Sequence, residues 1–311
     1  MNNNIKGLIL IIVGMIFIIT QDVLIKYTIH DASLMQILVF RGGMGFLLLS
    51  LYLIFTKQPI FIGTSYPFVA IFRGSTFFFG FTLFFISLSQ ISLAEATSLF
   101  FVSPFFITIY SYFILKIKIG LNRIFSIIVG FSGTLLIIKP EFNEINIFML
   151  FPIIAAATYA LSMTLAKKTA GKDSLFQQTF HIYIGAFIGG SLISIFLHNS
   201  DFNLSIFSIL SNPWIFNDYK FIGLILFIST NGCIGILCLI GAYRVGSPLI
   251  NAPAEYIHLV FAIILGFIVF NEIPDLYSFI GMFLIMTSGI YIVFRENMRN
   301  KLVVAETTLR T

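Results

Sequence analysis

Charged residues are scarce in this sequence. Only 10% of its 311 residues are Asp, Glu, Lys or Arg, whereas 58% are hydrophobic. A soluble globular domain carries about 25% charged residues, so the shortage excludes an ordinary soluble protein. The net charge of +5 does not indicate nucleic-acid binding, because the basic residues lie beside long apolar runs. We therefore expect the lipid bilayer, and no nucleic acid, as a partner.

Cysteine and recognisable catalytic motifs are also lacking. The two cysteines, Cys233 and Cys238, lie within one apolar run, which is typical of small core residues rather than of a disulfide or a metal site. The sequence contains no HExxH pair, no glycine-rich nucleotide loop and no Cys/His cluster. We therefore predict no catalytic residue, no bound metal and no cofactor.

Apolar runs of about 20 residues, the length that crosses a bilayer as a helix, fill most of the chain. The first run is too long for a cleavable signal and lacks a small-residue cleavage site, so we expect it to remain as a span. The pattern predicts ten membrane-spanning helices, at residues 7–27, 34–55, 67–88, 95–115, 121–138, 146–166, 176–197, 221–243, 248–270 and 277–294.

Lysine and arginine are distributed unequally between the two ends of these helices. With the N-terminus in the cytoplasm, and leaving out two arginines inside spans, thirteen of them lie on the cytoplasmic side. Only Lys26, Lys139 and Lys220 lie on the other side. Because positive residues gather on the cytoplasmic side, we predict a multi-pass protein of the inner (plasma) membrane with both termini in the cytoplasm. Residues 296–311 are expected to form a disordered cytoplasmic tail.

The two halves of the chain resemble each other weakly. At an offset of 141 residues Lys26 matches Lys167, and beyond a longer loop the offset becomes 154. Because each half contains five spans, an odd number, the second copy enters the membrane from the opposite side. We predict an all-α membrane protein of ten transmembrane helices in two inverted five-helix repeats, at residues 5–140 and 146–295. Such carriers hold their substrate near the midplane between the repeats.

Ionisable residues within the spans are the first candidates for function, because each is costly in hydrocarbon unless it is paired or wet. The rise of an α-helix places Asp22 and Arg41 near the outer ends of the first two spans, where they could pair. Arg73, His181 and Glu255 fall in the inner half of the membrane and could meet there.

The ninth span carries a polar stripe. Asn251, Glu255 and His258 are spaced i, i+4 and i+7, which places them on one helical face. Pro253 removes one backbone donor within that span, as Pro104 does in the fourth span. Interruptions in corresponding helices of two halves indicate a transport site, so we expect the stripe to line a cavity.

Structural roles remain open for several of these residues. Asp22 could pair with Lys26, one turn away on the same helix. Arg73 could extend to the inner surface, and His181 could be a hydrogen-bonded core histidine. Glu255 is the hardest to explain in this way, because no Lys or Arg lies within a turn on its own helix.

Four segments carry a family resemblance: "QDVLIKY" (21–27), "FRGG" (40–43), "PFVAIFRG" (67–74) and "APAEYIHLVFAIILGFIVFNEIPD" (252–275). Together with the ten spans they resemble the drug/metabolite transporter superfamily, of the EamA type, over residues 5–295. They are similar to S-adenosylmethionine importers and, more loosely, to riboflavin importers. The resemblance implies a central cavity lined by helices 1–4 and 6–9, with helices 5 and 10 as outer supports.

These observations predict a secondary transporter that moves a small organic metabolite by alternating access. The candidate substrate-binding or coupling residues are Asp22, Arg41, Arg73, His181, Asn251, Glu255, Tyr256 and His258. The acids would bind cationic groups or carry a coupling proton, and the arginines would hold carboxylates. A charged or zwitterionic solute, amino-acid-like or S-adenosylmethionine-like, suits both signs, with proton coupling and exchange both open.

Other functions are compatible with part of the pattern. The alternatives are a carrier of a flat aromatic metabolite such as riboflavin, an intramembrane enzyme, and a receptor or channel. Ten helices can enclose a site in a monomer, and a homodimer is equally compatible with the sequence.

Overall fold

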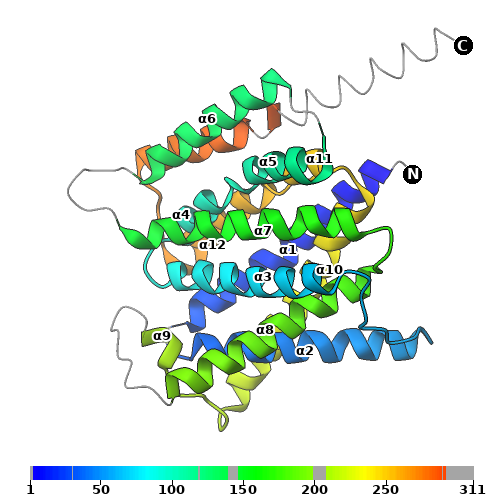
Figure 1. Cartoon of the computed structure of the whole chain (residues 1–311). Coiled ribbons are helices and arrows are strands. Elements are labelled where there is room, and N and C mark those ends of the chain that lie inside the picture. Colours follow the sequence, from blue (N-terminus) through cyan, green and yellow to red (C-terminus); the bar gives the residue numbers. More distant parts are fainter. Residues whose placement is uncertain are drawn as a thin grey trace, which may run out of the picture.

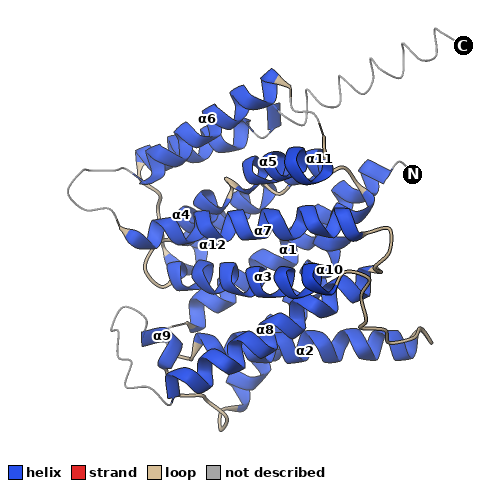
Figure 2. Cartoon of the chain, in the orientation of Figure 1, coloured by secondary structure: helices blue, strands red, loops and turns tan. Residues whose placement is uncertain are grey.

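Every regular element that the structure describes is a helix (Figure 2). The computed structural model describes residues 3–29, 31–117, 120–138, 146–198, 208–288 and 290–291, and the expected tail at 296–311 lies outside them. Seven of the described helices are long and apolar enough to cross a membrane, and three shorter apolar helices belong to the remaining spans. The expected all-α membrane fold with ten spans is confirmed.

The spans begin and end close to the boundaries expected from the sequence. In chain order they are α1 (Asn3–Thr28), α2 (Leu34–Phe55), α3 (Pro67–Leu88), α4 (Leu93–Phe100) with α5 (Ser103–Leu115), α6 (Leu121–Ile138), η1 (Ile147–Met149) with α7 (Leu150–Thr169), α8 (Leu175–His198), α10 (Tyr219–Val245), α11 (Pro248–Ala254) with α12 (Ile257–Phe270), and the helix Leu276–Ser288. A single turn, α9 (Ser208–Ser211), lies in the connection from α8 to α10.

Two of the spans are each divided into two helices. The first break separates Phe100 from Ser103, and the second separates Ala254 from Ile257. Pro104 lies in the first turn of α5, where its missing N–H needs no helical partner, whereas inside an unbroken helix it would disrupt the hydrogen-bond ladder. The two breaks lie 154 residues apart, which is the repeat offset. The two copies therefore interrupt the same span at the same place.

The two repeats pack against each other along most of their length (Figure 1). α1 lies on α10 and α3 lies on α7, which are equivalent pairs under the inverted repeat. α2 lies on α8, α4 on α12 and α5 on α11, and in each of these pairs a span contacts its own counterpart. The structure thus shows the two inverted five-helix repeats, and these five helix pairs all join one repeat to the other.

Glycine permits the closest contacts between these helices. A Cβ on Gly42 of α2 would lie 2.6 Å from the backbone nitrogen of Phe187 in α8, so the FRGG segment allows the two backbones to touch. α6 lies at the upper edge of the bundle in Figure 1. Gly133 of α6 and Gly281 would each place a Cβ within 2.6 Å of the other's carbonyl oxygen. α6 and the helix Leu276–Ser288 therefore form a peripheral pair, in the place expected for outer supports.

The outer face of the bundle exposes large apolar side chains, whereas Asp22, Arg41, Arg73 and Glu255 are buried within it. Phe55, Phe68 and Leu121 are each more than four-fifths exposed, whereas Asp22 and Glu255 are at most 1% exposed. A water-soluble protein shows the opposite distribution. This arrangement is the one expected for helices surrounded by lipid.

Candidate functional site

A small cavity lies between the two repeats. Residues of α1, α3, α4, α7, α10 and α12 line it, and its volume is about 30 Å³, which is room for about two water molecules. Its lining includes the polar side chains Asp22, Thr97, Tyr159 and His258 and the rings of Phe81, Phe84, Phe100 and Phe101. A metabolite can therefore enter only when these walls move apart.

Asp22 and His258 meet in this cavity from opposite repeats. His258 Nε2 lies 3.4 Å from Asp22 Oδ2, and both side chains are at least 94% buried. This separation is short enough for an ion pair but longer than an N–H···O hydrogen bond, and His258 Nε2 has no hydrogen-bond partner. Gln21 Nε2 donates to Asp22 Oδ1 at 3.0 Å. Oδ1 of Asp22 is thus hydrogen-bonded to Gln21, whereas Oδ2 lies opposite His258 without a hydrogen bond from it.

Arg41 lies beside this pair but is not part of it. Its guanidinium lies 5.7 Å from the ring centroid of Phe81 and 5.8 Å from that of Phe85, a geometry typical of cation–π contacts. Within the described residues no ion pair joins Arg41 to an acid, so the pairing with Asp22 that helix depth suggested is absent.

Gly232 of α10 leaves room for the side chains of Gln21 and Arg41. A Cβ on Gly232 would lie 2.1 Å from Gln21 Oε1 and 2.9 Å from Arg41 Nε, so any larger residue would displace both side chains. Arg41 also borders a smaller cavity, of about 20 Å³, that shares Phe81 with the central one. A buried guanidinium that forms no ion pair with an acid among the described residues therefore lies next to the Asp22 cavity.

Glu255 occupies the break between α11 and α12 and is completely buried. Tyr159 Oη donates to its Oε1 at 2.7 Å and Tyr243 Oη donates to the same atom at 2.5 Å. The other carboxyl oxygen, Oε2, has no partner. Since Tyr159 also lines the central cavity, its side chain contacts the buried acid and borders the space where Asp22 and His258 meet.

Arg73 and His181 lie away from the central cavity and do not meet Glu255. Arg73 is 1% exposed and donates from Nε to the carbonyl of Ser162 at 3.1 Å, so it does not extend to the inner surface. His181 Nε2 lies 2.8 Å from the carbonyl oxygen of Ile62. His181 borders a groove of about 460 Å³ between α3 and α8, outside the central cavity.

The three polar residues of the ninth span do not form one stripe. Asn251 Nδ2 donates to the carbonyl of Ala242 at 2.6 Å, Glu255 contacts the two tyrosines, and His258 faces the cavity. The expected single face is wrong because the helix breaks at Glu255. Tyr256 Oη donates to the carbonyl of Phe101 at 3.4 Å, which joins the two breaks.

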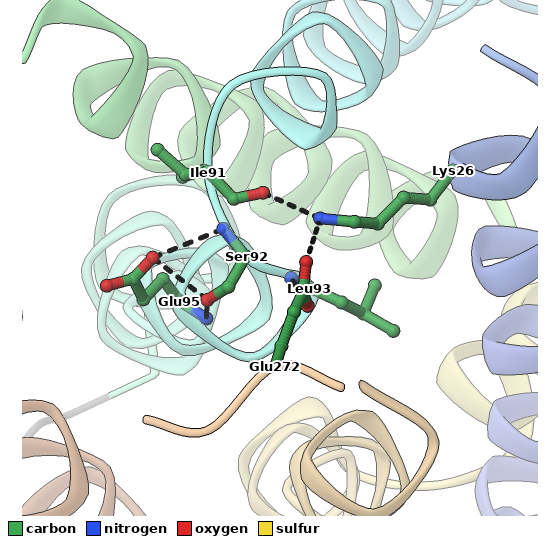
Figure 3. Close-up of polar contacts among 6 residues, drawn as sticks. All are labelled: Lys26, Ile91, Ser92, Leu93, Glu95 and Glu272. Atoms are coloured by element: carbon green, nitrogen blue, oxygen red, sulfur yellow. Dashed lines mark hydrogen bonds and ion pairs between the residues drawn. The ribbon is translucent and has the colours of Figure 1, made fainter. Parts of the chain in front are cut away.

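Sequence reasoning missed the partners of two charged residues. Tyr159 and Tyr243 carried no recognised signal, although Tyr159 follows Ile18, which also lines the cavity, by the repeat offset of 141. Lys26 does not pair with Asp22. It forms an ion pair of 2.7 Å with Glu272, which follows α12 (Figure 3).

The sequence profile of the EamA-like transporter family matches residues 5–139 and 146–295, one match in each repeat. The chain belongs to the EamA-like transporter family. This EamA-like protein is therefore a multi-pass membrane transporter rather than an enzyme, and its substrate is a small molecule. Family membership explains why the described residues form a duplicated helical bundle around a central cavity.

Characterised relatives of this EamA-like chain carry different solutes. The S-adenosylmethionine uptake transporter of Rickettsia bellii is 26% identical over 276 residues, which are 89% of each chain. The pseudopaline exporter CntI of Pseudomonas aeruginosa is 23% identical over 92% of this chain and 95% of the relative. The riboflavin transporter of Vibrio cholerae is 24% identical over 67% of this chain and 64% of the relative.

A solved crystal structure has the same fold as this EamA-like chain. The two align with a TM-score of 0.67 over 94% of this chain and 97% of the other, at 13% sequence identity. At that identity the likeness concerns the fold alone. The chemistry of this chain has to be argued from its own cavity.

Proposed function

We propose that this protein is a secondary transporter that moves a charged or zwitterionic organic metabolite through the central cavity by alternating access. The meeting of Asp22 and His258 inside an aromatic cavity between inverted repeats is the observation that carries the proposal. The Lys/Arg distribution supports an inner-membrane location with both termini in the cytoplasm. One chain encloses the cavity, so a monomer is sufficient.

The cavity and its flank suit a solute with both signs of charge. Asp22 offers a carboxylate to an ammonium or sulfonium group, and the surrounding phenylalanine faces attract a cation or stack on a flat ring. Arg41, without an acidic partner in the described residues, offers a guanidinium to a carboxylate. S-adenosylmethionine has all of these groups, and it is the solute named for the Rickettsia relative.

Glu255 is the group we assign to proton coupling. Glu255 lies in the break between α11 and α12, so a movement of either helix changes the environment of the carboxyl group. Two tyrosine hydroxyls stabilise the charged form while complete burial opposes it. The unpartnered Oε2 is the atom on which a proton would reside. Exchange of one solute for another without a proton is the competing mode.

Counterflow of S-adenosylmethionine into proteoliposomes tests the proposal. Asp22→Asn removes the charge with little change of shape, and we expect transport to fall about 100-fold, because a hydrogen bond to a charged group contributes about 1.5–3 kcal/mol. Asp31→Asn is the matched control, since Asp31 is exposed beyond the end of α1. Equal transport by both variants would remove Asp22 from the substrate site.

A flat aromatic metabolite such as riboflavin is the second candidate. The four phenylalanine rings around the cavity favour it, and a riboflavin transporter is among the relatives. The same variants separate the candidates: riboflavin carries no positive charge, so its uptake should survive Asp22→Asn, whereas uptake of a cationic or zwitterionic solute should not.

A further inference from the structure

One cluster of charges at the end of α1 joins three spans. Lys26 Nζ lies 2.7 Å from Glu272 Oε1 and donates to the carbonyl of Ile91 at 2.8 Å. Glu272 Oε2 accepts from the backbone nitrogen of Leu93, the first residue of α4, at 2.8 Å. Figure 3 shows Lys26 and Glu272 meeting beside the turn that begins α4. The cluster therefore ties α1, α4 and the end of α12 together.

The cluster lies beyond the cavity along the same two helices that form it. Lys26 is one turn past Asp22 in α1, about 6 Å along the axis, and Glu272 follows α12, which carries His258. The lysine also lies 5.4 Å from the ring centroid of Phe270. Any movement that separates α1 from α12 to open the cavity at this end must therefore separate Lys26 from Glu272.

The opposite end of the molecule has a related but uncharged contact. Lys167, the repeat counterpart of Lys26, donates to the carbonyls of Arg244 at 2.9 Å and Gly246 at 3.0 Å. The Arg244 carbonyl belongs to the last turn of α10 and the Gly246 carbonyl follows that helix, much as Ile91 follows α3. In the sequence, the position 154 residues before Glu272 is a lysine, Lys118. The repeat thus preserves the lysine but supplies an acid at one end only.

We propose that Lys26 and Glu272 form a gate that closes the cavity at their end, and that Lys167 closes the other end through backbone carbonyls. The inference rests on the proposed alternating access. Exposed ion pairs contribute little, but these side chains are only 10% and 21% exposed, and Glu272 also holds the start of α4. In the proposed orientation the Lys26–Glu272 gate faces the outside of the cell.

Side-specific labelling of a cysteine in the cavity tests the gate without any substrate. In the full chain, with Cys233 and Cys238 replaced by alanine, Ile18→Cys places a thiol on the cavity wall. A membrane-impermeant thiol reagent is added to intact cells or to inside-out vesicles. We expect Lys26→Gln and Glu272→Gln each to raise labelling from the outside about tenfold, the ratio that corresponds to a pair coupled by roughly 1.4 kcal/mol.

Matched variants separate gating from a general loss of stability. Lys167→Gln should raise labelling from the inside only, and the double variant Lys26→Gln/Glu272→Gln should label no faster than either single variant. Unchanged labelling in both single variants, or an equal rise from both sides, would overturn the gate. Because the readout needs no solute, the gate can fail while the proposed transport stands, and a failed counterflow assay leaves the labelling result intact.

Discussion

Phe101 and Glu255 occupy equivalent places in the two repeats, each at the break of a divided span. At the first break the Phe101 ring lines the cavity and packs 5.1 Å from the Tyr256 ring. At the second break the carboxyl group of Glu255 accepts hydrogen bonds from two tyrosine hydroxyls. The backbone interruption is common to both copies, whereas the ionisable group belongs to one. The duplication therefore provides two interrupted spans, and the carboxyl group to which we assign proton coupling lies at only one of them.

Replacing the acid at the second break should have the largest effect on stability. Glu255→Leu leaves the hydroxyls of Tyr159 and Tyr243 buried without their acceptor, and each orphaned hydroxyl costs about 1–3 kcal/mol. We expect a clear fall in the thermal unfolding midpoint of the detergent-solubilised protein. Phe101→Leu, the corresponding change at the first break, orphans no polar group and should lower the midpoint less. An equal fall would mean that the two breaks are energetically alike.

Glu255→Gln is the control for that experiment, because its amide oxygen still accepts from both tyrosines while the titratable proton is gone. We expect the unfolding midpoint to stay near that of the unmodified protein and the pH dependence of uptake to disappear. Uptake that keeps its pH dependence in this variant would contradict the assignment of proton coupling to Glu255.

The breaks illustrate how far the sequence predicts this structure. Hydropathy predicts ten helices, because membrane thickness and hydrogen bonding leave few alternatives. The odd number of spans in each half then predicts that the two repeats are inverted. Pro104 and Pro253 also predict interrupted spans. Depth places Arg73 near Glu255, yet Arg73 donates to Ser162 while Glu255 contacts two tyrosines. Depth along a helix follows from counting residues, whereas rotation about its axis depends on packing against helices distant in sequence.

The partner of Lys26, at the end of α1, likewise could not be predicted from the sequence of its own helix. Its i, i+4 spacing from Asp22 makes a pair between them plausible on α1 alone. The long lysine side chain instead extends past the end of its turn to Ile91 and Glu272, and Asp22 meets His258. Each of these partners comes from a different span, so helical periodicity within α1 could not identify it.

Substitution of each tyrosine that donates to Glu255 should distinguish a contact that only stabilises the fold from one that also affects uptake. Tyr159→Phe and Tyr243→Phe each remove one hydrogen bond, worth about 1 kcal/mol, and should lower the unfolding midpoint by similar amounts. Only Tyr159 lines the cavity, so only Tyr159→Phe should also change the KM for uptake. A matching change of KM in Tyr243→Phe would mean that both hydroxyls act through Glu255 and that neither touches the solute.

The bond between the two breaks should matter least. Tyr256 Oη lies 3.4 Å from the Phe101 carbonyl, longer than the usual O–H···O distance, and Tyr256→Phe keeps the contact between the rings. We expect a loss of stability below about 0.5 kcal/mol, the usual limit for a substitution that breaks no strong interaction, measured as the shift of the unfolding midpoint. A fall as large as that of Tyr243→Phe would show instead that this hydrogen bond couples the two breaks, so that the interrupted spans are stabilised together rather than separately.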